Sequence, residues 1–473
     1  MIQLQSVTTN VPSMSLTSCS VNGFFREYIV SQPIEDNMVF ALEEHCSQNS
    51  QYTGRHLVSR SSWDRDRYVF DSIDFSRLRS LTVFGEWKSF FISEKMKVLR
   101  VLDLEDTSEV TNDDLEQIVK LLSRLKFLSL RGITSLSRLP DSLGNLKQLE
   151  TLDVRHTSVA MLPSTIINLQ KLQYIRAGTT AARGDEEPSA QEMSTEGSSW
   201  LPNKFRRAQF ISSHPGVKLP RGIGKLMALH TLGVIDVGTK GGHAILKELK
   251  NLTQVRKLGV SGVNHDNVQD FYSAIMAQGH LQSLSARLDE DIQDFFSCLD
   301  DIPEESLKKN QTSFKLYGHV SKLLAWTSQL RNYIKLDVEM TVLMLEEVID
   351  SLGDITFLRR LRLCVKPSQD VELNICFRSQ LGREFLVLEF IEIDCSSRLQ
   401  LAFEEGAMRY LHLLKVHCAG GSQISGLAHL EELKEVQIIG SCDLALKQDL
   451  ERQLEEHPTK PKPVLVMEEV SSC

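Results

Sequence analysis

The chain has 473 residues, 41% of them hydrophobic, so it can bury a large core, and its length alone would suggest roughly two to four compact domains. Its formal net charge of −9 and pI near 5.9 provide no basic field that would attract phosphates, which excludes nucleic acid as an expected partner. The chain shows no secretory signal, no apolar run long enough for a membrane span, and no C-x-x-C pair among its nine cysteines. We therefore expect reduced thiols and a cytoplasmic location, with the nucleus left open as a second one.

From residue 78 onward one short pattern recurs, L-x-x-L-x-L with aliphatic variants. Successive copies are roughly 21 to 30 residues apart, except for one longer step between residues 172 and 229, and this period is typical of leucine-rich repeats. The last two apolar positions alternate with polar ones, which predicts a short strand with one buried and one solvated face. We predict an α/β leucine-rich-repeat solenoid, a horseshoe with a parallel β-sheet on its concave face and about 14 repeats. The clear copies begin at Leu78, Leu99, Leu125, Leu149, Leu172, Leu229, Val255, Leu281, Tyr333, Leu358, Leu388, Leu411 and Leu433, and a weaker one centres on Phe314 and Leu316.

The segments between the strands carry a second pattern, L-P-x-x-[IL]-x-x-L, at 139–146, 162–169 and 219–226. Its proline would start a turn or a helix, and its apolar residues three apart would pack on the sheet. Thr107, Thr157 and Thr180 stand three residues beyond the last strand anchor, where asparagine is common, and a threonine hydroxyl can still satisfy nearby backbone groups.

Composition sets the expected domain boundaries. Residues 55–457 form the predicted repeat domain, interrupted at about 178–203 by a flexible insert rich in Gly, Ser and acids. A helix at about 444–456 would cap the last repeat. The proline-rich segment 458–473 is predicted to be a C-terminal tail.

The L-P-x-x-[IL] repeats and their flanks resemble the C-terminal repeat region of plant nucleotide-binding (NB-ARC) leucine-rich-repeat disease resistance proteins of the cereal coiled-coil type. The stretches F-S-R-L-R-S-L-T-V-F-G at 75–85 and K-V-L-R-V-L-D-L-E at 97–105 are similar to that family's opening repeats. Arg55, His56 and Leu57 are similar to its R-H-L element, the strand that begins the array. The resemblance implies a recognition role in plant innate immunity.

Residues 19–29 resemble the end of the winged-helix subdomain that precedes the repeats in that family. The family's Met-His-Asp motif falls there on Val21, Asn22 and Gly23, so the imidazole that would sense a nucleotide phosphate and the carboxylate beside it are both missing. Residues 1–54 are accordingly expected to be a remnant of the winged helix and a linker, with the chain beginning in mid-domain. Since the chain also lacks a G-x-x-x-x-G-K-[ST] loop, we predict no nucleotide and no other cofactor.

The solvated strand positions, which would face the concave surface, are the candidate partner-binding residues. Arginine and aromatic side chains at such places often dominate interfaces, and we hypothesise a docking patch made of Arg131, Arg155, Tyr174 and Arg176. The alternative is a solvated charged face cross-linked by Asp-to-Arg pairs between neighbouring strands, and a solvated surface is also favoured for the cationic spot at Arg360 and Arg362. The full candidate set is Asp103, Glu105, Phe127, Arg131, Asp153, Arg155, Tyr174, Arg176, Arg360 and Arg362.

Catalytic and metal-binding signatures are missing from the sequence. There is no G-x-S-x-G, H-E-x-x-H or calcium-loop pattern, and His56, His156 and His230 have no partners at informative spacing. Cys364, Cys395 and Cys418 follow strand anchors and could align as a ladder, but they lack a short chelating pair, so no metal is expected. The sequence thus predicts a protein that is not an enzyme.

The expected partners are proteins: a pathogen effector, a guarded host protein, or the NB-ARC and coiled-coil domains of a complete receptor. The main alternative is a generic intracellular repeat scaffold or signalling adaptor without an immune role. The substrate-selecting arm of a ubiquitin ligase and a secreted receptor ectodomain are weaker alternatives, because residues 1–60 do not resemble an adaptor-binding domain and no signal peptide or membrane span is found.

Overall fold

The chain divides into two compact units, Met1–Leu229 and His230–Cys473, in a computed structural model. The structure describes residues 39–42, 55–59, 74–178, 216–289, 312–318, 333–341, 349, 352–353, 355–366, 372–378, 385–395, 397–440 and 443–468.

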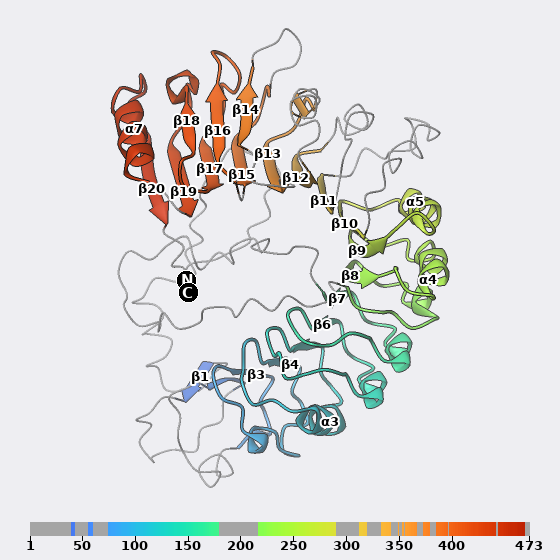
Figure 1. Ribbon diagram of the computed structural model, residues 1–473. Helices are drawn as coiled ribbons and strands as arrows, with labels where there is room; N and C mark the ends of the chain where they lie inside the picture. The colour runs from blue at the N-terminus through green and yellow to red at the C-terminus, as the bar shows by residue number, and fades with distance from the viewer. Residues whose placement is uncertain are drawn as a thin grey trace. The chain divides into compact units, whose positions relative to one another are not determined.

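The first unit is built on parallel strands that pair in the order of the chain (Figure 1). Their register places the second anchor of every repeat in one row, from Leu57 and Leu81 to Ile175, and these side chains are fully buried. Stacking therefore supplies the apolar cover that a single strand lacks. The strands are β1 (Val39–Leu42), β2 (His56–Ser59), β3 (Ser80–Val83), β4 (Val101–Asp103), β5 (Phe127–Ser129), β6 (Thr151–Asp153) and β7 (Tyr174–Arg176).

Short helices return the chain across the covered face of this sheet. In the L-P-x-x-[IL] segments, Pro140 and Pro163 hold the extended conformation just before a 3-10 helix, and Leu143 and Ile166 insert into the core. The α-helix of the described part of this unit has Thr111 as its N-cap, and the Thr111 side chain forms a capping box with Asp114. These elements are η1 (Ser89–Phe91), α3 (Asn112–Leu121), η2 (Asp141–Asn145), η3 (Ser164–Asn168) and η4 (Ile223–Lys225).

Strands β4, β5 and β6 each lead into a tight turn that uses a left-handed residue. Equivalent positions are occupied by Asp106, Gly132 and His156, with φ of 55°, 77° and 56°. A Cβ on Gly132 would lie 1.8 Å from Oδ1 of Asp106, so glycine is favoured there and a larger residue would displace that carboxylate. The hydroxyl groups of Thr107 and Thr157 then donate to the carbonyls of Val83 and Val154, which confirms their predicted role.

The second unit continues the same parallel pairing with longer strands. Helices cover one side of β8 and β9 (Figure 1). The strands are β8 (Thr231–Asp236), β9 (Lys257–Val263), β10 (Ser283–Leu288), β11 (Ser313–Tyr317), β12 (Lys335–Thr341), β13 (Arg360–Lys366), β15 (Phe390–Cys395), β17 (Leu413–Cys418), β19 (Glu435–Gly440) and β20 (Val464–Glu468), and the helices are α4 (Gly242–Leu249), α5 (Val268–Met276), η9 (Leu427–His429) and α7 (Leu444–Glu455).

Near the C-terminus the returning segments are strands instead of helices. They form a second, three-stranded parallel sheet of β14 (Leu373–Phe377), β16 (Leu399–Phe403) and β18 (Gln423–Ser425). Its inner face is apolar and buried, with Phe377 stacked on Phe403 at 5.5 Å between ring centroids. Two sheets thus enclose the core of the last repeats.

The structure confirms the predicted α/β leucine-rich-repeat solenoid with a parallel sheet, and each of the 14 sequence copies contributes a strand. It differs from the expected boundaries at two points. Strand β1 lies before residue 55, and β20 lies in the segment assigned to a tail, because Leu465 and Met467 continue the rows of Val436 and Ile438. The Val21–Gly23 position lies outside the described residues, as do Thr180 and all but Gly178 of the acidic insert.

Candidate functional site

The open face of each unit consists of the strand residues that point away from the buried core. In β4, Leu102 is buried whereas Val101 and Asp103 on either side are half-exposed. Because the register joins equivalent residues, outward side chains of successive strands form rows across the sheet. One such row in the first unit is Val58, Thr82, Asp103, Ser129, Asp153 and Arg176.

Asp153 is the centre of the open face of the first unit. It is only 3% exposed, and its carboxylate binds two arginines. Arg155 donates from Nε at 3.0 Å and Nη2 at 2.7 Å, a two-point contact, and Arg176 of the next strand places Nη1 at 3.6 Å. The side chain of Arg176 remains 46% exposed, so the buried acid holds a cation whose outer surface is free of protein cover in the described chain.

A second ion pair lies next to it. Arg131 Nη1 is 2.9 Å from Glu105 Oε1 on the neighbouring repeat. Burial raises the pKa of Glu105 more than the nearby Arg131 lowers it, and burial likewise raises the pKa of Asp103, against the hydrogen bond from the Glu105 amide. The acids of this face therefore lie in a partly desolvated environment.

Two aromatic side chains lie in a second outward-facing row, which is formed by the residues directly before the buried anchors. Phe127 and Tyr174 flank Thr151 in register, and all three are half-exposed. They add apolar contact area beside the arginines of the adjacent rows, a combination that is frequent in protein interfaces.

The second unit carries a row of alternating charge on its open face. Lys315, Asp337, Arg362, Glu392 and Lys415 stand side by side in register on five successive strands. The Lys315 Nζ to Asp337 Oδ2 distance is 2.7 Å. Opposite charges at directly neighbouring positions stabilise one strand register against a shift of one residue.

Glu392 is the most strongly held acid of this row. Its carboxylate lies 3.0 Å from His417 Nε2, 3.2 Å from Lys415 Nζ and 3.6 Å from Arg362 Nε. Burial alone would raise the pKa of Glu392, but the hydrogen bond from His417 and the charges of Arg362 and Lys415 together lower it to about 2. Glu392 is therefore a structural anion.

The cationic spot predicted in β13 has two different environments. Arg360 stacks over the ring of Phe390 at 4.2 Å, a cation–π contact, whereas Arg362 faces Glu392. Both point to the open face, as the alternation of β13 requires. Arg359 instead pairs with Glu389 at 2.7 Å.

The structure brings Asp153, Arg155 and Arg176 together, and Glu105 with Arg131. The ion-pair cross-links weighed as the alternative are thus present. Glu392, Lys415 and His417 were not among the predicted site residues, although Arg362 was, and although the central residue of L-x-L in these repeats alternates in sign from Lys315 to Lys415. That alternation was the available signal.

Cys364 does not join Cys395 in the cysteine ladder considered from the sequence, and the Cys418 side chain lies outside the described ones. Cys364 pairs in register with Asp394, whereas Cys395 pairs with Val365, so Cys364 and Cys395 point to opposite faces of the sheet. The reason is that Cys364 follows its last anchor directly while Cys395 is one residue further on. Burial raises the pKa of the Cys395 thiol, which disfavours the reactive thiolate.

In the described parts of the chain, no three His, Cys, Asp or Glu side chains converge as a metal ion would need. Within the same ranges, no helix has both the length and the apolar composition for crossing a membrane. Each open face carries paired charges and half-exposed aromatic residues, which suits contact with another macromolecule.

The chain belongs to the leucine-rich-repeat family, since the family model described as a leucine-rich repeat region matches residues 77–186 and 200–463. This repeat fold is non-catalytic. A solved leucine-rich-repeat protein of Leptospira interrogans is also similar, with a TM-score of 0.47 and 17% identity over 87% of this chain and 95% of that one.

The relatives of this chain include plant disease resistance proteins. Disease resistance protein Pik-2 of Oryza sativa subsp. japonica is 25% identical over 468 residues, covering 93% of this chain and 45% of the relative. Disease resistance protein RGA4 of the same species is 26% identical over 471 residues, covering 96% of this chain and 42% of the relative. The chain thus spans less than half the length of these relatives, and the resemblance to the repeat region of cereal disease resistance proteins is confirmed.

Proposed function

We propose that this chain is a non-catalytic recognition module of plant innate immunity that binds a protein through the open face of its first unit. The match to rice disease resistance proteins along 93% of the chain supports the immune role. The observation that carries the binding proposal is the group of Asp153, Arg155 and Arg176, beside Arg131, Phe127 and Tyr174. We place this activity in the cytoplasm, with the nucleus as a second location.

Arginines that are already ordered by a neighbouring carboxylate favour binding for an entropic reason. A free arginine loses rotamer freedom when a partner immobilises it, whereas Arg155 is already ordered by its two-point contact with Asp153. Arg176 keeps an exposed surface for a partner's carboxylates or carbonyls. The proposed partners are a pathogen effector, a guarded host protein, or the NB-ARC and coiled-coil domains of a complete receptor.

The test compares the proteins that co-purify with the full chain and with an open-face variant. Both are expressed in plant cells, and the partners are identified by quantitative mass spectrometry. The variant carries Arg131→Ala, Arg155→Ala, Tyr174→Ala and Arg176→Ala. A matched control carries Lys97→Ala, Arg124→Ala and Lys147→Ala, which removes exposed cations away from the open face. Because the variant leaves Asp153 buried without its arginines, a second version adds Asp153→Asn to remove the uncompensated charge.

We expect a receptor, its domains or an effector to be recovered with the wild type and the control and lost with both open-face variants. Equal recovery with all proteins would exclude the open face as the binding surface. A reproducible set of housekeeping partners would favour the scaffold function instead.

A further inference from the structure

Strand β20 lies at the edge of the parallel sheet of the second unit. It pairs in register with β19, and with no other strand that the structure describes (Figure 1). Its sequence, V-L-V-M-E, is apolar apart from the last residue. An apolar edge strand can pair with a strand of another chain, because its outer main-chain groups are unpaired. The edge of β20 is therefore a candidate interaction surface, separate from the open face of the first unit.

The outer main-chain groups of this edge belong to Leu465 and Met467. Val464 N donates to Lys434 O at 2.9 Å, so the main-chain groups of Val464 point toward β19. In a parallel ladder these directions alternate from one residue to the next. The N–H and C=O groups of Leu465 and Met467 consequently point away from β19, and each residue offers one donor and one acceptor.

The side chains of the same two residues are incompletely covered. By register, Leu465 and Met467 continue the buried rows of Val436 and Ile438. The two residues of β19 are fully buried, whereas Leu465 and Met467 are half-exposed. The apolar core thus reaches the surface at β20, where a further strand with inward apolar side chains would cover it.

A second copy of β20 fits this edge in an antiparallel register. With a two-fold axis at Val466, Leu465 stands opposite Met467 of the second copy, and Met467 stands opposite its Leu465. In an antiparallel pair, every second pair of opposite residues exchanges both main-chain hydrogen bonds. This register therefore uses all the outward N–H and C=O groups of Leu465 and Met467, and it joins the two cores through the same side chains.

The charges beside the strand favour an antiparallel copy over a parallel one. Lys462 precedes β20 and Glu468 ends it, and both are exposed. Lys462 contacts the main-chain carbonyl of Glu455, which leaves its charge in place. In the register about Val466, Glu468 stands opposite Val464 of the second copy, two residues from its Lys462 and within the reach of diagonal neighbours. A parallel copy in line would place Glu468 beside Glu468, which is unfavourable.

Helix α7 carries a second pair of charges with the same complementarity. Lys447 Nζ and Glu451 Oε1 are 4.0 Å apart, and both side chains are exposed. At roughly 100° per residue, these two side chains point away from Asp449 and from Gln453, which bonds to β18 and η9. The two-fold axis reverses the direction of the second α7, so a Lys-to-Glu order faces a Glu-to-Lys order.

We propose that β20 pairs antiparallel with β20 of a second copy of this chain, about Val466, and that the two second units thereby form a symmetric dimer with a continuous sheet. This interface goes beyond the proposed function of the open face of the first unit and does not depend on it.

The test measures the molar mass of the full chain by sedimentation velocity over a series of concentrations. The variants are Val466→Lys and Val466→Glu, because Val466 is half-exposed on the open face and stands opposite itself across the axis. Like charges directly opposite one another are unfavourable, so each variant should weaken the dimer about tenfold or more. An equimolar mixture places Lys opposite Glu and should recover dimers with an affinity within about threefold of the wild type.

The matched control is Gln437→Lys. Gln437 is in register with Val466 on β19 and lies in the same outward row, but it is one strand further from the axis. The two introduced charges would be about 14 Å apart at a strand spacing of about 4.8 Å, beyond the Debye length of about 8 Å at physiological ionic strength. Dimerisation should therefore match the wild type. Circular dichroism of every variant checks that the chain is folded.

A wild-type chain that is monomeric at every concentration would overturn the proposal and leave the edge to a strand of another protein. Undiminished dimerisation of Val466→Lys would place the dimer on a different surface, and no recovery in the mixture would exclude the register about Val466; either result overturns the proposal. The open-face variants of the first unit should dimerise like the wild type, so failure of the proposed function is measured separately.

Discussion

Two nearly buried carboxylates, Asp153 and Glu392, organise the cations of the open faces. Each is less than a tenth exposed, and each is contacted by cations from its own or a neighbouring strand. A buried acid of this kind is costly without its partners, so the contacts fix both the acid and the cations. The consequence at the residue scale is a surface whose charged groups are positioned before any partner arrives.

Glu392→Gln tests this at the second unit. The substitution keeps the shape of the side chain but leaves Arg362, Lys415 and His417 around a neutral group, and we expect a loss of roughly 3 kcal/mol in local unfolding free energy. Hydrogen exchange of the amides in β13, β15 and β17 measures it. Glu404→Gln, about half-exposed and 3.7 Å from Arg378, is the control and should change exchange by less than about 0.5 kcal/mol.

The same residue predicts a dependence on pH. The folded pKa of Glu392 is about 2, below its ordinary value of 4.5, so the unfolded chain binds the proton more tightly. Its stabilisation is complete above pH 4.5 and is lost as the pH falls toward 2. Denaturant unfolding of wild type and Glu392→Gln should therefore differ most at pH 6 and converge near pH 2; a constant difference over this range would contradict the assignment.

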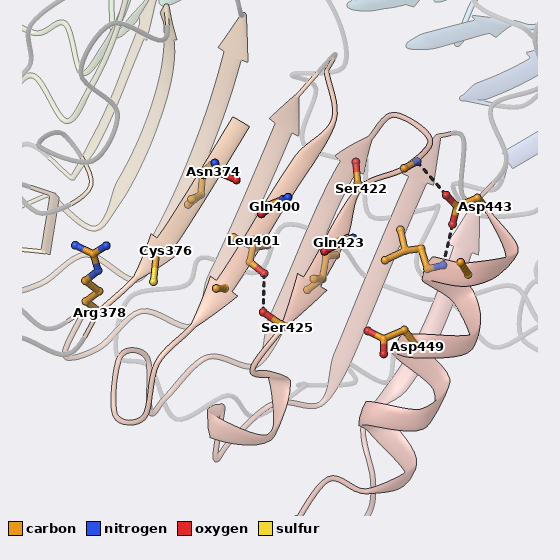
Figure 2. A pocket seen from close by; sticks show the side chains of 16 residues that line it. Asn374, Cys376, Arg378, Gln400, Leu401, Ser422, Gln423, Ser425, Asp443 and Asp449 are labelled. Carbon is orange, nitrogen blue, oxygen red and sulfur yellow. Dashed lines mark hydrogen bonds between the residues drawn. The ribbon is translucent and has the colours of Figure 1, made fainter. Parts of the chain in front are cut away.

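At the scale of elements, the returning segments determine which surface each repeat exposes on the side opposite its open face. In the first unit they are 3-10 turns and α3, whereas the last repeats use β14, β16 and β18. The strands follow from the period-two alternation of Leu373, Ile375 and Phe377 and of Leu399, Leu401 and Phe403. A sheet exposes a flat outer face and an edge, and here α7 closes that edge (Figure 2).

Gln453 is the residue through which α7 closes the edge of β18. Its side-chain amide donates to Ile424 O at 2.7 Å and accepts from Leu427 N at 3.4 Å, in place of a further strand. Gln453→Ala should raise the exchange rates of β18 and η9 by an amount equivalent to about 1 to 2 kcal/mol. Gln448→Ala, exposed on the same helix, should leave them unchanged; equal effects of the two would show that helix propensity and not edge closure is responsible.

At the scale of the whole molecule, stability should be local, because each repeat contacts mainly its neighbours. Leu128→Ala removes a fully buried anchor of β5, and we expect a cost of about 3 kcal/mol in β4, β5 and β6. Exchange in β13 to β19 of the second unit should not change. The exposed Arg124→Ala is the control, and uniform destabilisation of both units would show instead that the chain unfolds as one cooperative body.

The sequence alone predicts the strand positions and their buried faces, because the L-x-x-L-x-L spacing is a local property of each repeat. It also located the L-P segments, the threonine hydroxyl contacts and the alternation that puts Arg360 and Arg362 on one face. The pairing of charges, such as Arg176 with Asp153 and His417 with Glu392, could be read only from the folded chain, since these pairs join separate repeats through the strand register. Strand β20 and the separation of Cys364 from Cys395 were decided in the same way, because pairing between repeats depends on how strands stack and not on any one stretch of sequence.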